Sequence, residues 1–336
     1  MPSTQRPDTD KAVVVSGIRK TFGSVVALRD ISFEVEQGEV LGLLGPNGAG
    51  KTTMVDILST LTRPDCGRAQ VAGHDVMSDP AGVRRSIMLT GQHVALDDML
   101  TGQENLLMFG RLQGLKKKAA RARAEELLDQ FDLVDAAARL VSTYSGGMRR
   151  RIDIACGLVV RPQVVFLDEP TTGLDPRSRQ SIWDLVGDFK KAGIATLLTT
   201  QYLEEADVLS DRIIVIDHGT IIAVGTADEL KERTGGTYCE IVPRHLNDVP
   251  AMVQALSGLL TQENRAALTS AADRIAMPAP DGPATLARAL ARLDAANIEL
   301  QDIALRRPSL DEVFLALTSV DGRVASATGI NGKVLS

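Results

Sequence analysis

The sequence predicts an α/β fold in which helices cover a mainly parallel sheet. Apolar, strand-like segments alternate with helical patterns along the first two thirds of the chain. Hydrophobic residues make up 44% of the chain but aromatic residues only 3%, so the core must consist mostly of Val, Ile, Leu and Ala. Such a core is typical of buried parallel strands. With 336 residues, the chain is long enough for one large and one small domain.

Composition and charge exclude several classes of function. The net charge of −6 argues against binding to nucleic acid, because affinity for a phosphate backbone requires a basic face. Neither a signal peptide nor an apolar run of the roughly 20 residues that a membrane helix needs is present. We therefore expect membrane contact only through a partner. The cysteines lack metal-ligand spacing and indicate a reducing compartment: Cys66, Cys156 and Cys239.

The first predicted elements follow a polar segment, residues 1–10, that we expect to be flexible. Residues 12–18 and 31–35 are predicted strands, separated by a turn around Gly23. Residues 39–45 read as a buried strand and residues 50–61 as the helix that follows it. Helical periodicity without a strand signal continues over residues 101–140. This pattern indicates an all-helical insertion, with limits at about residues 93 and 160.

Strand patterns return after this insertion. Residues 163–169 and 194–200 are apolar strands that precede helices near 177–192 and 203, and residues 212–225 form a hairpin that turns at His218 and Gly219. Gly235 and Gly236 suit a linker. We predict a first domain over residues 11–232 and a small α+β domain over 237–320, closed by a helix at 309–318 and followed by a flexible tail, 321–336.

A phosphate-binding loop is predicted between the buried strand and its helix. The segment fits G-x-x-x-x-G-K-[ST], in which backbone N–H groups surround phosphate oxygens at a helix N-terminus. Lys51 would reach the β- and γ-phosphates, and Thr52 would offer its hydroxyl to Mg²⁺. The alternative, a simple Gly-rich turn, is unlikely because the pattern arises by chance on the order of once in a hundred chains of this length. The predicted nucleotide contacts are Gly45, Pro46, Asn47, Gly48, Ala49, Gly50, Lys51, Thr52 and Thr53.

Two carboxylates follow the strand at residues 164–168. Asp168 at the strand end is predicted to hold Mg²⁺ through water, and Glu169 to orient a water molecule for attack on the γ-phosphate. Without a preceding phosphate loop, a helix N-cap followed by a solvated acid would be the preferred interpretation of such a pair. The preceding phosphate loop favours the catalytic interpretation.

A second anion site is predicted at Ser145, Gly146 and Gly147, where a hydroxyl and bare amides begin a helix. Because one ATP has a single γ-phosphate, this site is best used on the nucleotide of another subunit. In isolation, an N-cap serine followed by flexible glycines is the commoner meaning.

These motifs, in this order, resemble the ATP-binding subunits of ABC transporters over residues 11–232. Residues 144–148 match the family's signature and residues 173–175 its D-loop, which ends in Asp175. Gln92 matches the Q-loop, and Phe22 lies where the family stacks an aromatic ring on adenine. The resemblance implies a P-loop NTPase (RecA-like) core with an antiparallel β subdomain. It further implies that Phe22, Gln92 and Asp175 contact ATP, and that Gln92 also serves Mg²⁺.

The resemblance also implies partners. Two copies would form a head-to-tail homodimer that encloses two ATP molecules, and hydrolysis would drive separate permease subunits docked near Gln92 and the insertion. The chain would then lie at the cytoplasmic face of the membrane. A more specific resemblance, in segments such as "TYSGGMRRRIDIACGLV" and "RRPSLDEVFLALT", is to the daunorubicin-resistance ATP-binding subunits (DrrA) of actinobacteria. It extends to about residue 320 and implies export of anthracyclines or complex lipids through permeases of the DrrB type.

Two residues depart from the general family pattern. Met148 replaces the glutamine of the signature, and we interpret it as a packing residue. Gln201 replaces a histidine at the end of the strand at 194–200. Since an amide can donate and accept hydrogen bonds but cannot titrate, we predict that Gln201 positions substrate while Glu169 acts as the catalytic carboxylate, with Lys51. The neighbouring arginines at 149–151 read as one solvated helix surface.

Two other functions are compatible with the phosphate loop. One is a soluble ABC ATPase that acts as a mechanical switch without transport, and the other is a P-loop kinase. The single cassette and the negative charge argue against the first, and the SGG motif argues against the second. We expect the C-terminal domain to be regulatory or to stabilise the dimer, with Val313, Phe314 and Leu317 in its core.

Overall fold

A computed structural model of the chain describes residues 11–91, 96–233, 236–259, 269–270, 273–307, 309–310 and 312–314. Gln92, Leu317 and the predicted flexible ends, 1–10 and 321–336, lie outside these residues. The chain divides into two compact units after Val224. The predicted boundary, between residues 232 and 237, lies a few residues further along the chain.

A parallel sheet is the centre of the first unit and confirms the predicted fold class. Its order is β10-β9-β3-β8-β7-β6, and the five strands from β9 to β6 are parallel. Every residue of β3, β7 and β8 is buried, as the apolar segments predicted. The strands are β3 (Val40–Leu44), β6 (Ile87–Thr90), β7 (Val164–Asp168), β8 (Ala195–Thr200), β9 (Arg212–Asp217) and β10 (Thr220–Gly225).

A second, antiparallel sheet has the order β2-β1-β4-β5. Its strands are β1 (Lys11–Phe22), β2 (Val25–Glu36), β4 (Cys66–Val71) and β5 (His74–Asp75). The buried side chains of β1 and β2 join α1 (Lys51–Leu58) and the central strands in one apolar core. Sequence analysis missed β4, β5 and β6, because they are short and several of their residues are polar or half-exposed.

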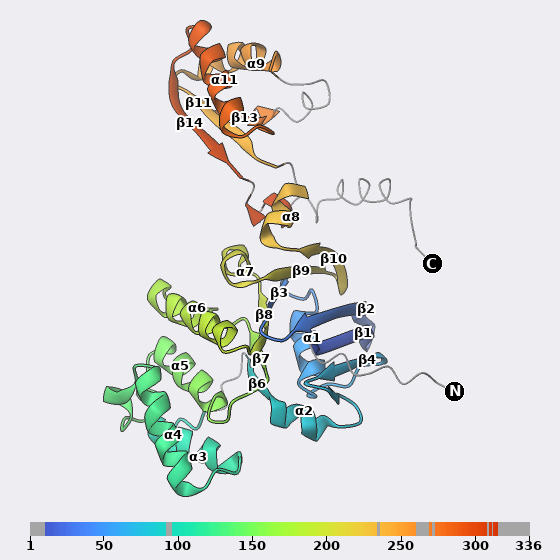
Figure 1. Cartoon of the computed structure of the whole chain (residues 1–336), viewed down its shortest axis with the longest axis vertical. Coiled ribbons are helices and arrows are strands. Elements are labelled where there is room, and N and C mark those ends of the chain that lie inside the picture. The colour runs from blue at the N-terminus through green and yellow to red at the C-terminus, as the bar shows by residue number, and fades with distance from the viewer. Residues whose placement is uncertain are drawn as a thin grey trace. The chain divides into compact units, whose positions relative to one another are not determined.

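Helices alone form the predicted insertion. Within the described residues 96–160, the chain contains only helices and 3-10 turns, besides one isolated bridge between Thr101 and Leu140. Helices α3 (Gly102–Leu112), α4 (Lys117–Gln130) and α5 (Gly146–Gly157) lie on the opposite side of the central strands from the antiparallel sheet (Figure 1). Thr101 and Glu104 form a capping box that begins α3. A second apolar core joins these helices to β7 and β8.

The remaining helices of the first unit are α2 (Pro80–Ser86), α6 (Pro176–Lys191) and α7 (Leu203–Leu209). Asp79 and Asp175 cap α2 and α6, and a proline follows each cap, which explains where both helices begin. The hairpin between β9 and β10 turns at His218 and Gly219, both with positive φ, as predicted.

The second unit begins with α8 (Ala227–Arg233) and has a sheet of order β12-β13-β11-β14. Its own apolar core includes Cys239, Met252 and Leu293. The strands are β11 (Tyr238–Pro243), β12 (Thr269–Ser270), β13 (Ile275–Pro278) and β14 (Leu300–Arg306), and the helices α9 (Val249–Ser257) and α11 (Pro283–Ala295).

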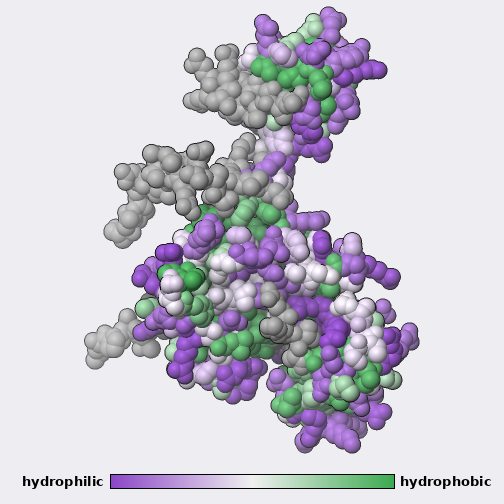
Figure 2. Space-filling view, turned by 180° about the vertical axis from the view of Figure 1, so that it is seen from behind, coloured by the Kyte–Doolittle hydropathy of each residue, from purple (hydrophilic) through white to green (hydrophobic). Residues whose placement is uncertain are grey.

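No helix among the described residues is long and apolar enough to span a membrane. Hydrophobic and hydrophilic side chains are interspersed on the face of the first unit shown in Figure 2.

Candidate ATP site

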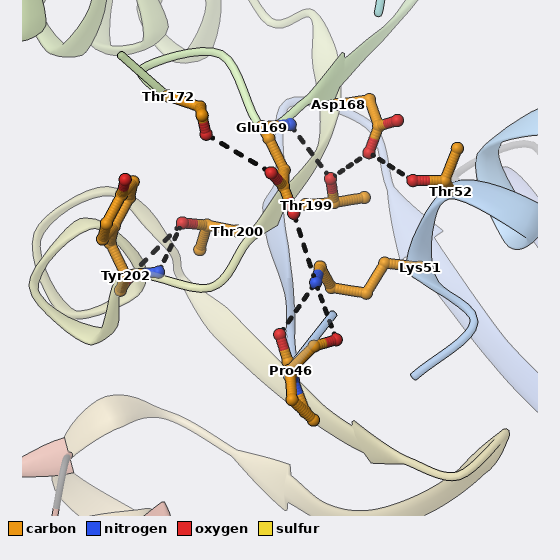
Figure 3. Close-up of polar contacts among 10 residues, drawn as sticks. Pro46, Lys51, Thr52, Asp168, Glu169, Thr172, Thr199, Thr200 and Tyr202 are labelled. Carbon is orange, nitrogen blue, oxygen red and sulfur yellow. Dashed lines mark hydrogen bonds and ion pairs between the residues drawn. The ribbon is translucent and has the colours of Figure 1, made fainter. Parts of the chain in front are cut away.

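The predicted phosphate loop connects β3 to α1. Gly50 has a φ of 107°, and a Cβ there would lie 2.6 Å from the carbonyl oxygen of Ala27, so only glycine fits without strain. Lys51 is only 3% exposed. Its Nζ donates hydrogen bonds to the carbonyl oxygens of Gly45 (2.8 Å) and Pro46 (3.1 Å). Figure 3 shows Lys51 pointing toward Pro46. The loop therefore curls around the ammonium group, which can exchange these carbonyl contacts for phosphate oxygens.

Strand register brings the other site residues to the same end of the sheet. β8 lies between β3 and β7; Leu44 pairs with Thr200, and Asp168 pairs with Thr199. The carboxyl ends of parallel strands form the usual ligand-binding edge of an α/β sheet. The phosphate loop, Glu169 and Gln201 therefore follow directly after three neighbouring strands.

Glu169 is held in a constrained conformation. Its φ of 47° is in the left-handed region, which costs a non-glycine residue on the order of 1–3 kcal/mol and is common at functional sites. Its N–H donates to the carbonyl oxygen and to Oγ1 of Thr199, both at 3.1 Å. Its carboxylate accepts a hydrogen bond from Thr172 (3.3 Å) and lies 3.3 Å from Lys51 Nζ. The buried charge of Lys51 is thus paired with the predicted catalytic carboxylate.

Oxygen atoms suited to Mg²⁺ lie beside this pair. Asp168 is 3% exposed, and its Oδ1 accepts hydrogen bonds from Thr199 and, at 3.4 Å, from Thr52. Burial raises the pKa of the nearby Asp56 carboxyl, and the charge of Asp168 raises it further. Among the described residues, no group of three or more His, Cys, Asp or Glu side chains is arranged so that it could hold a metal ion by itself. One carboxylate and one hydroxyl nevertheless fit Mg²⁺, which takes few protein ligands and completes its shell with phosphate and water.

Gln201 directly follows the last residue of β8, and Phe22 is the last residue of β1. Gln201 is half-buried and follows Thr200, whose Oγ1 accepts a hydrogen bond from the N–H of Tyr202 (2.9 Å). Phe22 ends β1 with 51% of its surface exposed, and Lys20 Nζ is 5.1 Å from the ring centroid. A flat exposed ring of this kind can stack on a base. Gln92 belongs to the undescribed residues 92–95.

The signature begins α5, and its Gly146 lines one pocket together with Glu169 and Thr172. Ser145 caps α5 and accepts a hydrogen bond from the N–H of Met148 (3.3 Å), and Met148 packs against the second apolar core, which confirms its packing role. Asp175 caps α6 through Ser178, whose hydrogen bonds lower the pKa of Asp175. Among the described contacts, no hydrogen bond or ion pair joins the signature to the phosphate loop.

Sequence analysis missed Thr199. Its hydroxyl donates to Asp168 and accepts from the backbone N–H of Glu169, so it aligns both carboxylates. A polar residue inside the fully buried strand β8 was the available signal.

Comparisons with known proteins agree with this geometry. A family model described as "ABC transporter" matches residues 28–172. A solved ATP-binding subunit of an ABC transporter superimposes with a TM-score of 0.61 at 27% identity, over 67% of this chain and 93% of that one. Fold, phosphate loop and paired carboxylates define an ABC-type ATPase, in which ATP hydrolysis is coupled to transport.

Relatives define the family more closely. The doxorubicin resistance ATP-binding protein DrrA of Mycobacterium tuberculosis is 72% identical over 312 residues, which cover 92% of this chain and 94% of the relative. The daunorubicin/doxorubicin resistance ATP-binding protein DrrA of Streptomyces peucetius is 50% identical over 309 residues, with 92% of each chain covered. The chain belongs to the DrrA family of ABC transporter ATP-binding proteins, as the sequence motifs predicted.

Proposed function

We propose that this chain hydrolyses ATP to drive the export of anthracycline-like drugs or complex lipids through separate permease subunits of the DrrB type. It would act at the cytoplasmic face of the membrane, which it would contact only through the permease. The relatives' names, which refer to doxorubicin and daunorubicin, support the drug class. Because the similarity to these proteins extends over nearly the whole chain, the alternative function, a soluble ABC ATPase that acts as a mechanical switch without transport, is not favoured.

The arrangement around Glu169 carries this proposal. Lys51 binds the β- and γ-phosphates, and Glu169 accepts a proton from the attacking water. Thr172 and Thr199 hold Glu169 in place through their hydrogen bonds. Thr52 and Asp168 would hold Mg²⁺, with Gln92 as a further ligand, and the ion would neutralise charge on the transferred phosphoryl group. Gln201 offers an amide that can donate to the γ-phosphate or orient the water.

Two copies would complete each site. In each subunit, the phosphate loop, including Thr53, and the ring of Phe22 would also contact ATP. Ser145, Gly146, Gly147 and Asp175 of the opposing subunit would contact the same ATP. The signature begins α5, and among the described residues no hydrogen bond or ion pair joins it to the phosphate loop of its own chain, which supports a head-to-tail homodimer. In this proposal residues 237–320 form a domain that regulates the dimer or stabilises it.

Replacing Glu169 by glutamine tests the mechanism. The amide keeps the size and the hydrogen bond from Thr172 but cannot accept the proton, so steady-state hydrolysis should fall on the order of 10²- to 10⁴-fold. ATP binding should persist, and a closed dimer should accumulate in size-exclusion chromatography with ATP. An unimpaired hydrolysis rate would show that Glu169 is not the base.

The substrate class requires a separate transport assay. Membrane proteins that co-purify with the chain would be reconstituted with it in vesicles, and uptake of anthracyclines would be compared with that of complex lipids. If ATP drives the uptake of neither anthracyclines nor complex lipids, the proposed substrates are wrong.

A further inference from the structure

Three consecutive arginines, Arg149 to Arg151, have different surroundings in the folded chain. Arg149 pairs with Asp98 at the surface. Arg151 donates to the carbonyl oxygens of Phe131 (2.8 Å) and Asp132 (3.3 Å) next to α4. The side chain of Arg150 is only 10% exposed. The interpretation of this run as one solvated helix surface is therefore wrong for Arg150.

Arg150 connects three segments that carry different motifs. Its Nη1 donates to the carbonyl oxygen of Gly91 (3.0 Å) and its Nη2 to Oγ1 of Thr90 (3.2 Å), at the end of β6. Its Nε donates to the carbonyl oxygen of Pro170 (3.1 Å). Arg150 itself lies on α5, five residues after Ser145. One guanidinium group thus links the signature helix, the residue before Gln92 and the residue after Glu169.

Charge and geometry both suit arginine here. Burial lowers the pKa of Arg150, and the negative charges of Asp153, Asp168 and Glu205 act against this shift. The Asp153 carboxylate lies 3.5 Å from Arg150 Nη1 on the same helix. A planar guanidinium can donate in several fixed directions at once, whereas a lysine ammonium cannot reproduce this fork. Charge-assisted hydrogen bonds of this kind are stronger than neutral ones.

These contacts hold the Glu169 backbone from both sides. Thr199 accepts hydrogen bonds from the N–H of Glu169, and Arg150 holds the carbonyl oxygen of Pro170, the next residue. Glu169 has a positive φ, so its backbone needs such restraints to keep that conformation. If the contact from Arg150 is lost, the peptide after Pro170 is free to relax, and the Glu169 carboxylate can then leave its position.

We propose that Arg150 is a positioning residue, which holds the Glu169 carboxylate and the end of β6 at Gly91 in place from the signature helix. This inference rests on the proposed role of Glu169 in hydrolysis. Arg150 does not need to touch ATP for this role, because it acts through the Pro170 and Gly91 carbonyl groups.

Arg150→Lys tests the role, with Arg151→Lys as the matched control on the same helix. In the full-length chain assembled with its co-purifying membrane subunits, Arg150→Lys should lower kcat about 10- to 100-fold, since small misplacements of catalytic groups cost this much. KM for ATP should change less than about twofold, because the phosphate loop is untouched. Arg151→Lys should change neither value by more than about twofold. Equal losses in both variants would overturn the inference.

A double-mutant cycle separates positioning from general structural damage. In the Glu169→Gln background, Arg150→Lys should change the residual rate by less than about twofold, because the carboxylate it positions is gone. Multiplicative losses in the double variant would show that Arg150 acts independently of Glu169, and the inference would be wrong.

Hydrogen exchange gives a readout that does not depend on hydrolysis. The amide of Thr172 donates to the carbonyl oxygen of Glu169 (3.3 Å), and its exchange should accelerate in Arg150→Lys but not in Arg151→Lys. Unchanged exchange would overturn the inference even if Glu169 is the base. If Glu169→Gln alone leaves hydrolysis unimpaired, the proposed mechanism fails, whereas the exchange result still decides whether Arg150 holds this loop. Thermal melting shows whether Arg150→Lys is folded. If it is not, Arg150→Gln, which keeps an amide donor, is tested in its place.

Discussion

At the residue scale, the ATP site depends on side chains that serve two groups at once. The Thr199 hydroxyl contacts Asp168 and the backbone of Glu169, and Lys51 contacts the phosphate loop and the Glu169 carboxylate. Because each of these residues is buried, a change in one alters the position of the others. The metal-binding and catalytic carboxylates therefore form a single connected group.

Gln201 should contribute to turnover without introducing pH dependence. Loss of a preorganised donor typically costs on the order of 10²- to 10³-fold in rate, so Gln201→Ala should lower kcat by up to this amount. Gln201→His should remain active and acquire a pH dependence near pH 6.5, where imidazole titrates. Steady-state hydrolysis between pH 6 and pH 9 measures both effects. Wild-type activity in Gln201→Ala would show that this position has no catalytic role.

Glu205 on α7 should make stability depend on pH. Its side chain is 1% exposed, and Trp183 Nε1 donates to it at 3.3 Å. Burial raises the pKa of Glu205 above its ordinary value of 4.5, against the effects of Thr200, Thr171 and Trp183. The folded protein thus binds this proton more tightly than the unfolded chain. The resulting stabilisation is complete below pH 4.5 and is lost as pH rises through the folded-state pKa.

Glu205→Gln should remove this dependence. The melting temperature of the variant minus that of wild type should be larger at pH 8 than at pH 5. At pH 8 the wild-type protein must bury a charged carboxylate, whereas glutamine carries no charge to bury. The exposed neighbour Glu204 offers a matched control, and Glu204→Gln should show little change between the two pH values. A pH-independent difference for Glu205→Gln would contradict the raised pKa.

At the element scale, α5 and α6 begin side by side. A Cβ on Gly147 would lie 2.2 Å from Ser178 Oγ, whereas a Cβ on Gly146 would meet no atom within 4 Å. The two glycines of the signature therefore have different reasons to be glycine. Gly147 permits close packing on α6, and Gly146 leaves open space at the helix start.

Alanine at each position should separate these roles. Gly147→Ala displaces Ser178 or breaks its hydrogen bond to Asp175, and should destabilise the chain by about 1–3 kcal/mol. Gly146→Ala should leave the unfolding free energy within about 0.5 kcal/mol. If the signature binds ATP of a second subunit, Gly146→Ala should nevertheless weaken ATP-dependent dimerisation. Denaturant unfolding and size-exclusion chromatography measure the two effects. Normal dimerisation and hydrolysis in Gly146→Ala would argue against the proposed second phosphate site.

At the scale of the whole molecule, each compact unit has its own apolar core. The two cores of the first unit contain residues between Ala12 and Ile221, and the core of the second unit contains residues between Cys239 and Leu305. Among the described residues, no residue belongs to cores of both units. The first unit should therefore fold without the second.

Truncation after Gly236 tests this independence. The shortened chain should unfold cooperatively and bind ATP with an affinity within about twofold of the full chain, because all described site residues lie in the first unit. Comparison of ATP-dependent dimerisation then shows whether residues 237–320 stabilise the dimer. An aggregated or unfolded product would show that the first unit depends on the second.

Local patterns predicted much of this structure. The strands β3, β7 and β8 are buried throughout and mostly apolar, and the phosphate loop has a fixed spacing, so both could be recognised from neighbouring residues. Short strands such as β5 and β6 could not, since two to four residues carry too little periodicity. Asp168 and Glu169 were predictable as a pair, but the hydrogen bonds that Thr199 makes to both were not, because they depend on the pairing of β7 with β8.

The sequence by itself determined the class of fold, the ATP-binding motifs and the family, because each depends on residue types at fixed spacings along the chain. Tertiary structure decided which of those residues meet. Only the order β3-β8-β7 brings Lys51, Glu169 and Gln201 to one edge of the sheet, and only the packing of α5 directs Arg150 toward Gly91 and Pro170. Contacts between residues 20 to 120 positions apart depend on strand order and burial, which short-range patterns do not encode.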